Sequence, residues 1–335
     1  MWRRPGSDNG RMADNTQAAV GEFDLIATYF TRPVRRAALG VGDDCALLAP
    51  APGMQLAVSS DMLVEGRHFL STVAPDRLGH KALAVNLSDL AACGAKPLAF
   101  TLALALPRLD NAFLRGFSDG LWALAERFDI ELIGGDTTQG PLNLCITVLG
   151  EVPTGQALLR SGARAGDQLW VSGTVGDARL ALEAVRGTVD LPGADFTAVR
   201  RAMELPEPRV ALGQALRGVA SAAMDVSDGL LGDLCHLLKR SGVGVRIDVD
   251  AVPRSAVLAR QSLAWQRECT LAGGDDYELL FTAPPERAEA VRAAGAAAGV
   301  AVSCIGRIEA EPGVRLHDAA GQPLPANYRS FDHFL

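Results

Sequence analysis

The stretch from Lys81 to Leu106, KALAVNLSDLAACGAKPLAFTLALAL, decides the fold class. Its first part carries leucines at i, i+4 and i+7, which predicts an amphipathic helix over 77–93. These residues are Leu83, Leu87 and Leu90. Gly94 and Pro97 end that helix, and the apolar run 98–106 reads as a buried strand. A helix that passes directly into a buried strand indicates a mixed α/β fold.

The same alternation of strand and helix continues along the chain. Further strands are predicted at 56–60, 130–134, 142–149, 169–172, 243–249, 277–283 and 301–309, with another running into Asp225. Further helices are predicted at 111–128, 177–186, 208–217, 229–240 and 286–298. A chain of 335 residues is too long for one ordinary core. We therefore expect two α/β domains.

The best boundary between the two domains is the polar segment that begins at Pro153. It divides the chain into an N-terminal domain over 20–152 and a C-terminal domain over 153–335. Residues 1–19 have no apolar pattern and read as a loose tail, and translation could begin at Met12. This tail carries arginines without the apolar run of an export signal.

Composition excludes several classes of protein. The formal net charge is -7 and only Lys81, Lys96 and Lys239 are lysines, which argues against a nucleic-acid surface. No apolar run reaches the roughly 18 residues of a membrane span. Six cysteines stand far apart without a Cys-x-x-Cys pair, and we expect them to be reduced, mostly buried thiols of a cytoplasmic protein.

No lysine lies in a phosphate-binding loop of the Gly-x-x-x-x-Gly-Lys-Ser/Thr type. If the protein handles ATP, it must neutralise the triphosphate with metal ions and arginine. Aspartates flanked by Gly, Ser, Asn or Thr follow several apolar runs, and their oxygens suit Mg²⁺. The clusters are GDDC (42–45), SSD (59–61), NLSD (86–89), GGDTT (134–138) and DVSDG (225–229).

Each cluster also has an ordinary interpretation, because an Asp beside Gly or Ser is commonly a turn or a helix N-cap. Several such clusters in one acidic chain favour a metal site. Asn86 and Asp89 lie three apart on one helix, and the helix start after Asp225 also offers backbone amides to phosphate. By contrast, Asp248 and Asp250 are expected to face solvent, and SGTVGD (172–177) to form a tight turn.

Taken in order, the motifs resemble the bacterial thiamine-monophosphate kinase family over 21–334. They are GEFDLIATYF, GVGDDCALL, SSDMLVEGRHF, KALAVNLSDLAACGAKP, LIGGDTTQGP, LRSGARAGD, MDVSDGLLGDL, AGGDDYEL and the closing FDHF. The resemblance implies the two-domain fold of aminoimidazole ribonucleotide synthetase, with the N-terminal domain pairing with its twin in a homodimer. It also implies transfer of the ATP γ-phosphoryl group to thiamine monophosphate, giving thiamine diphosphate.

The resemblance further implies site residues, position by position. Magnesium ligands would be Asp44, Ser59, Ser60, Asp61, Asp89, Asp136, Asp225 and Asp228, of which Asp44, Asp61, Asp89, Asp225 and Asp228 would carry catalysis through the metal. ATP would contact Gly135, Asp136, Arg160 and Ser227. Thiamine monophosphate would contact His68, Asp275 and Tyr328. Asn86 would orient Asp89, and Asp43, next to the ligand position Asp44, would assist metal binding without contacting the ion itself.

This sequence departs from the family pattern at two of these positions. Similar sequences usually carry Glu in place of Asp275 and often Trp in place of Tyr328. The shorter aspartate would need a water or a small shift to reach the substrate, whereas a tyrosine can still stack on a cationic ring.

Little acid–base chemistry is expected, because the acceptor is a phosphate oxygen that is already anionic near neutral pH. No residue is expected to act as a covalent nucleophile. Selenophosphate synthetase, aminoimidazole ribonucleotide synthetase and a hydrogenase-maturation relative remain alternatives within the superfamily. Residues 1–40 lack the Cys and Lys of the first, and the chain does not end in the cysteine of the last. A nucleotide-binding subunit without turnover is the alternative from another class.

Overall fold

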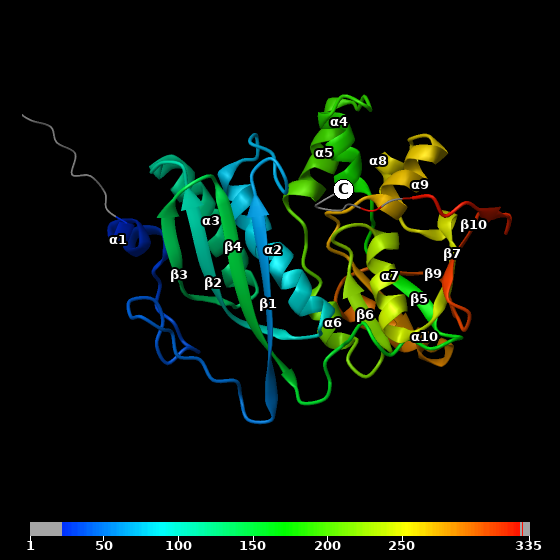
Figure 1. Ribbon diagram of the computed structural model, residues 1–335, viewed down its shortest axis with the longest axis horizontal. Coiled ribbons are helices and arrows are strands. Elements are labelled where there is room, and N and C mark those ends of the chain that lie inside the picture. Colours follow the sequence, from blue (N-terminus) through cyan, green and yellow to red (C-terminus); the bar gives the residue numbers. More distant parts are fainter. Residues whose placement is uncertain (1–21, 329, 331–335) are drawn as a thin grey trace, which may run out of the picture.

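The computed structural model describes residues 22–328 and 330, and these form two sheets with helices around them (Figure 1). The first sheet has the strand order β1-β4-β2-β3. Its strands are β1 (Met54–Val64), β2 (Lys96–Leu106), β3 (Glu131–Gln139) and β4 (Asn143–Pro153). β2 and β3 run parallel, and the other two pairs are antiparallel.

One face of this sheet is covered by α2 (Pro75–Ala92) and α3 (Asn111–Arg127). The Asp110 carboxylate begins α3 by accepting the backbone N–H groups of Ala112 and Phe113. The two helices approach closely where Gly120 meets α2, because a Cβ there would lie 1.8 Å from the carbonyl oxygen of Asp76. Glycine at this position is therefore a packing requirement.

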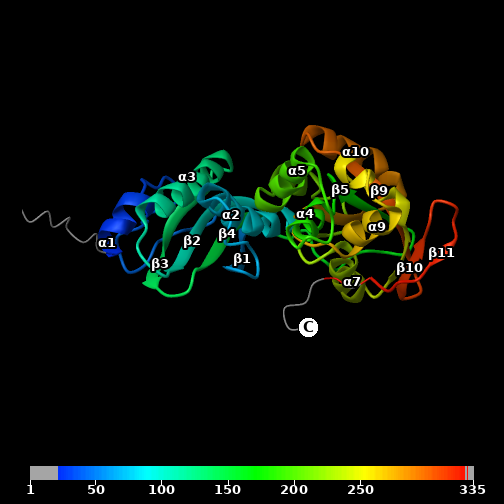
Figure 2. The ribbon, with the colours of Figure 1, turned by 90° about the horizontal axis from the view of Figure 1, so that it is seen from above.

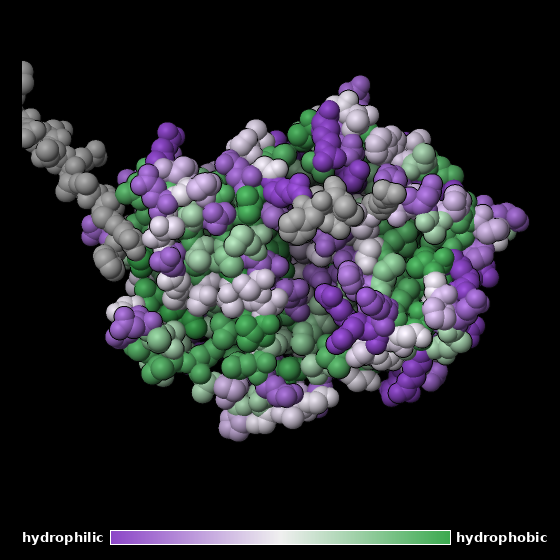
Figure 3. All heavy atoms as spheres, viewed as in Figure 1, coloured by the Kyte–Doolittle hydropathy of each residue, from purple (hydrophilic) through white to green (hydrophobic). Residues whose placement is uncertain are grey.

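The opposite face of the four-stranded sheet is partly open. Leu56, Val58 and Met62 of β1 point out from it and are 41%, 62% and 55% exposed. Figure 3 shows a broad hydrophobic area over this sheet on the face turned to the viewer. Apolar surface of this kind on a sheet face is typical of an interaction surface.

The second sheet has seven strands in the order β11-β10-β7-β9-β5-β8-β6. Its strands are β5 (Gln168–Ser172), β6 (Ala222–Asp225), β7 (Gly244–Asp248), β8 (Leu279–Ala283), β9 (Val302–Glu309), β10 (Gly313–His317) and β11 (Pro323–Leu324). Successive residues face opposite sides. Trp170 and Phe281 join the core that includes α2, whereas Leu169 and Leu280 join the core beneath α7.

The helices of this half are α4 (Asp177–Val185), α5 (Gly193–Glu204), α6 (Val210–Ala215), α7 (Leu230–Ser241), α8 (Ala256–Ala259), α9 (Leu263–Ala272) and α10 (Ala288–Ala297). The N-terminal part of the described chain contributes α1 (Glu22–Leu25) and a π-helical turn, Ile26–Phe30. Helix α2 also contacts α6 and β6, so it joins the two halves. Figure 2 shows the two sheets side by side with α2 reaching between them.

The mixed α/β class and most of the predicted elements are confirmed, although β1 extends well beyond the predicted 56–60. Helices α1, α5, α8 and α9 and strands β10 and β11 were not predicted. The expectation that the cysteines are mostly buried is wrong, because only Cys269 is buried. The loose tail over 1–19 lies outside the described residues, and the boundary at Pro153 stays a prediction. In the described part of the chain, no helix combines the length and apolar character that a membrane crossing needs.

Candidate active site

A cavity of about 560 Å³ lies between β1 and α2 on one side and the loops after β6 and α9 on the other. It is lined by four of the aspartates that the sequence nominated as metal ligands, Asp61, Asp89, Asp225 and Asp228. Ser227, His68 and Asp275 also line it. Residues from six sequence segments therefore meet in one place, as a substrate-binding site requires.

Strand β1 divides its polar residues between its two faces. Ser59 faces α2 and donates a short hydrogen bond to the Asp89 carboxylate, and Asp61 lies two residues on, on the same face. Ser60 points the opposite way, where its hydroxyl contacts the Thr147 hydroxyl at 2.9 Å. Ser59 and Ser60 were nominated together, but the side chain of only Ser59 turns toward the cavity aspartates.

Helix α2 supplies the polar wall of the cavity. The Ser88 hydroxyl donates to Asp225 Oδ2 at 2.6 Å, which links α2 to the end of β6. The Asn86 side-chain oxygen accepts the backbone N–H of Asp61 at 3.2 Å, and its amide donates to Ala82. Asn86 was expected to orient Asp89, but it holds the β1 backbone instead.

Burial raises the pKa of three of the cavity carboxyls, those of Asp61, Asp89 and Asp225. Burial raises the pKa of Asp225 to about 7, and the charge of Asp89 adds to the rise. Burial likewise raises the pKa of Asp61 to about 6, with Asp89 and Asp228 adding to it. The pKa of Asp89 is raised by burial too, against the opposing effects of Ser59 and Arg160. The cavity therefore concentrates negative charge that favours a cation or a proton.

The loop between β6 and α7 is fixed by Asp233. One oxygen of its carboxylate accepts the backbone N–H groups of Ser227, Asp228 and Gly229, each at 3.0 Å. Asp233 therefore already engages three of the amides near this helix start, and the expectation that amides here bind phosphate stays a prediction. Asp233 holds the loop so that Asp225 and Asp228 both face the cavity.

The carboxylates of this cavity suit Mg²⁺ better than they suit a metal ion whose ligands are all protein side chains. Among the described residues, no group of three His, Cys, Asp or Glu side chains is already placed to hold a metal ion. Magnesium is commonly held by one or two carboxylates together with water and substrate phosphates. Carboxylates spread along the wall of an open cavity fit that mode of binding.

Asp44, Gly135 and Asp136 do not line this cavity. Asp44 is exposed in a loop, and Asp136 is exposed on β3, at the opposite edge of the sheet from β1. Three strand spacings separate those edges, or about 14 Å. At Gly135, which has φ 151°, a Cβ would lie 1.9 Å from the Leu102 carbonyl oxygen, so only glycine fits.

Arg160 and Tyr328 stand outside the cavity wall. Arg160 is exposed, and its charge partly offsets the rise that burial causes in the pKa of Asp89. Tyr328 is half-buried and packs against the core beneath the seven-stranded sheet. Ser330, two residues on, accepts the backbone N–H of Gly232 on α7 at 2.9 Å, so the chain returns to the helix that follows Asp228.

Lys81 and Tyr277 line the cavity and were missed. Lys81 lies on the same face of α2 as Val85 and Asp89, at i, i+4 and i+8, and this periodicity could have identified it. No phosphate-binding loop surrounds Lys81, so its sequence context gave no indication of a role with ATP. Tyr277 is the first residue of the strand predicted over 277–283, and nothing in the sequence there indicated a site residue.

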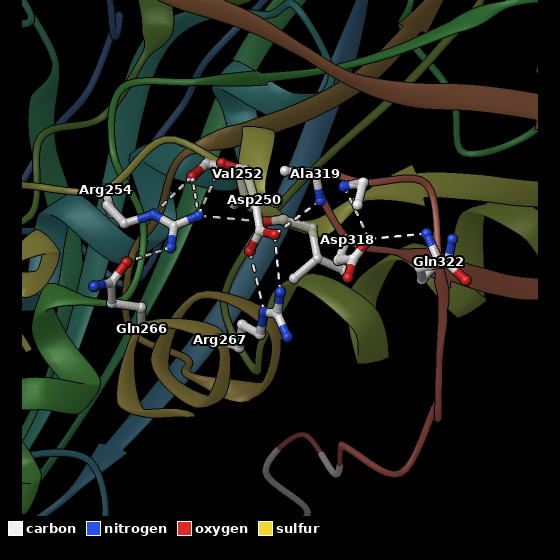
Figure 4. Close-up of polar contacts among 10 residues, drawn as sticks. Asp250, Val252, Arg254, Gln266, Arg267, Asp318, Ala319 and Gln322 are labelled. Carbon is white, nitrogen blue, oxygen red and sulfur yellow. Dashed lines mark hydrogen bonds and ion pairs between the residues drawn. The ribbon is translucent and has the colours of Figure 1, made fainter. Parts of the chain in front are cut away.

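Two expectations outside the cavity have different outcomes. The SGTVGD segment connects β5 to α4 through bends at Gly173 and Gly176, with φ 56° and 97° there, and its expected tight turn is not assigned. Asp248 is exposed, but the expectation that Asp250 faces solvent is wrong. Its carboxylate accepts Arg267 Nη2 at 2.8 Å and the Ala319 N–H at 3.0 Å (Figure 4). Asp250 therefore ties α9 to the C-terminal segment.

Comparison with known proteins gives matches over both halves. The profile of the AIR synthase related protein, N-terminal domain, matches residues 42–152, and that of the C-terminal domain matches 164–319. Thiamine-monophosphate kinase of Salmonella typhimurium is 46% identical over 328 residues, which is 94% of this chain and 99% of that protein.

Solved structures agree with this result. The crystal structure of thiamine-monophosphate kinase from Stenotrophomonas maltophilia K279a has 45% identity and a TM-score of 0.80, covering 86% of this chain and 92% of that one. AaThiL complexed with AMPPCP and TMP has 30% identity and a TM-score of 0.74, with coverage of 85% and 89%.

Proposed function

Because this chain belongs to the thiamine-monophosphate kinase family of AIR synthase related proteins, we propose that it transfers the ATP γ-phosphoryl group to thiamine monophosphate. The products are ADP and thiamine diphosphate. The observation that carries the proposal is the cavity, which gathers Asp61, Asp89 and Asp225 with Asp275 and His68. A related structure holds both an ATP analogue and thiamine monophosphate.

Magnesium is the metal we propose for this cavity, held by Asp61, Asp89, Asp225 and Asp228. When bound, it supplies positive charge that offsets repulsion between donor and acceptor phosphates. Ser59 and Ser88 keep two of these carboxylates oriented through hydrogen bonds to Asp89 and Asp225. No side chain has to remove a proton, because the attacking oxygen belongs to a phosphate that is already ionised.

We assign the remaining site residues by family position. ATP would contact Gly135, Asp136, Arg160 and Ser227, and thiamine monophosphate would contact His68, Asp275 and Tyr328. The charge of Arg160 near Asp89 and the place of Ser227 in the cavity support the first set. His68 and Asp275 in the same cavity support the second.

A homodimer built on the open face of the four-stranded sheet completes the proposal. That face carries the exposed Val58 and Met62, and Asp136 lies on it in register with Met62 across the sheet. Asp136 and Asp61 are on opposite faces, so they cannot hold the same ion within one chain. Asp44 and Asp136 would then serve a cavity from the partner's copy. We also propose the domain division 20–152 and 153–335, and a cytoplasmic location.

The decisive experiment is a mass-spectrometric assay of the purified protein with ATP, Mg²⁺ and thiamine monophosphate. Free thiamine and selenide serve as parallel acceptors. Thiamine diphosphate should form only from the monophosphate, and chelation of the metal should abolish it. Nucleotide binding without turnover of any acceptor would contradict the proposal and favour a non-catalytic subunit.

A further inference from the structure

Lys81 is buried in the middle of α2 with 2% of its surface exposed. Among the buried side chains that the structure describes, it is the only lysine or arginine. Burying an ammonium group is unfavourable unless it is paired and hydrogen-bonded. A lysine is therefore retained here for its contacts and its charge, since an apolar residue would fill an ordinary helix core position without that cost.

Its ammonium group bridges two segments that are far apart in sequence. Lys81 Nζ donates to Asp275 Oδ2 at 2.6 Å and to the His68 carbonyl oxygen at 3.2 Å. Asp275 and His68 are two of the three residues proposed to bind thiamine monophosphate. Lys81 thus joins both of them to α2, whose next two turns carry Val85 and Asp89 along the same cavity wall.

The backbone at Asp275 is also held in an uncommon conformation. Its φ is 72°, which is rare for a residue with a side chain, and its N–H donates to the Ser227 carbonyl at 2.7 Å. The adjacent Asp276 turns elsewhere and accepts the Gly176 N–H at 2.9 Å. Strain of this kind persists only where surrounding contacts enforce it. Here those contacts direct the Asp275 carboxylate to Lys81 in the cavity.

We propose that Lys81 is a positioning residue for thiamine monophosphate, holding the Asp275 carboxylate and the His68 loop in the arrangement that binds this substrate. The inference rests on the proposed function. Without the ammonium group, Asp275 would share the cavity with other carboxylates, among them Asp61 and Asp228, and repulsion would turn it away. The effect should fall on the phosphate acceptor and leave ATP binding unchanged.

The first test compares kinetic constants of Lys81→Met, Lys81→Gln and Lys81→Arg with those of the wild-type protein. We expect the two neutral variants to raise KM for thiamine monophosphate by about tenfold or more, with KM for ATP within about twofold. Arginine keeps the charge and should restore most of the affinity. Lys96→Met is the matched control, because Lys96 is half exposed and pairs only distantly with Glu151, at 3.7 Å.

The second test is a double-mutant cycle between Lys81→Gln and Asp275→Asn, read by calorimetric binding of thiamine monophosphate. If Lys81 acts through Asp275, the double variant should bind no more weakly than Asp275→Asn alone. Additive losses, or a lower melting temperature with unchanged KM, would overturn the inference. Failure of the wild-type protein to convert thiamine monophosphate would instead overturn the proposed function, so the two failures are distinguishable.

Discussion

Asp225 is the residue in which stability and function are most clearly opposed. It is 4% exposed, and burial together with the Asp89 carboxylate raises its pKa to about 7. Asp225→Asn removes a buried charge and keeps the shape of the side chain. We therefore expect the melting temperature of the metal-free protein to stay the same or to rise by up to about 4 °C. Turnover should fall by at least about 100-fold, because a metal-binding carboxylate is lost.

The comparison needs both calorimetry and the product assay on the same preparation. Asp248→Asn serves as a control, because Asp248 is exposed at the end of β7, outside the cavity. Near-normal turnover of Asp225→Asn at low Mg²⁺ would contradict the assignment of Asp225 as a ligand.

A pH dependence follows from the same carboxyls. Burial raises the pKa of Asp225 to about 7 and that of Asp61 to about 6, both above the unfolded value near 3.9. The folded protein then binds more protons than the unfolded chain, so stability without metal falls as pH rises from about 4 to about 7. Magnesium binds the ionised carboxylates, so its stabilising effect should grow over that range.

Thermal melts with and without Mg²⁺ at several pH values measure this effect. The increase in melting temperature caused by Mg²⁺ should be small near pH 5.5 and largest above about pH 7.5. The Asp225→Asn variant should show a weaker dependence on pH. A magnesium effect of constant size at all pH values would show that these carboxyls do not bind the ion.

The sequence predicted individual site residues where the chemistry is local. Asp61, Asp89 and Asp225 follow apolar runs beside Ser or Asn, and all three line the cavity. The sequence did not identify Lys81 as a site residue, because its role depends on Asp275, which is 194 residues away along the chain. Similarly, the engagement of backbone amides by Asp233 depends on how the loop folds back over the helix start.

At the scale of elements, strong periodicity was predictive and weak periodicity was not. The alternation of Leu142, Leu144, Ile146 and Val148 predicted β4, and the leucine stripe predicted α2. Helix α5 begins at Gly193, directly after Pro192, and its only buried apolar residues are Val199 and Met203, so its apolar face is short. Helix α9 begins at Leu263, and the hydroxyl of its N-cap residue Ser262 accepts the backbone N–H of Trp265, a sequence signal that was overlooked.

The contact between α2 and α3 provides an element-scale test. A Cβ at Gly120 would lie 1.8 Å from the Asp76 carbonyl oxygen, so Gly120→Ala forces the helices apart. We expect the free energy of unfolding to drop by about 3 kcal/mol. Gly193→Ala is the control, because nothing lies within 4 Å of that Cβ at the start of α5.

Urea denaturation of both variants measures these changes. Gly193→Ala should be neutral or slightly stabilising, since alanine reduces the freedom of the unfolded chain. Equal stability of Gly120→Ala and the wild-type protein would mean that the two helices do not pack as closely as described.

For the whole molecule, the open sheet face links assembly to the site. Val58 is 62% exposed on that face, while Ser59 beside it turns inward to Asp89. If the homodimer buries this face, Val58→Asp places one carboxylate from each subunit in an apolar interface. Bringing these two like charges together costs several kcal/mol. Light scattering should then report a monomer, whereas Leu263→Asp, an exposed leucine at the start of α9, should leave the mass unchanged.

The same variant tests whether the site needs a second copy. Asp136 lies on the open face, about 14 Å across the sheet from β1, so the cavity of one chain lacks it. A monomeric Val58→Asp protein should therefore fold normally yet bind ATP and Mg²⁺ weakly, because the partner's aspartates are absent. Full turnover by that monomer would mean that Asp61, Asp89, Asp225 and Asp228 suffice, and Asp44 and Asp136 would lose their assigned role.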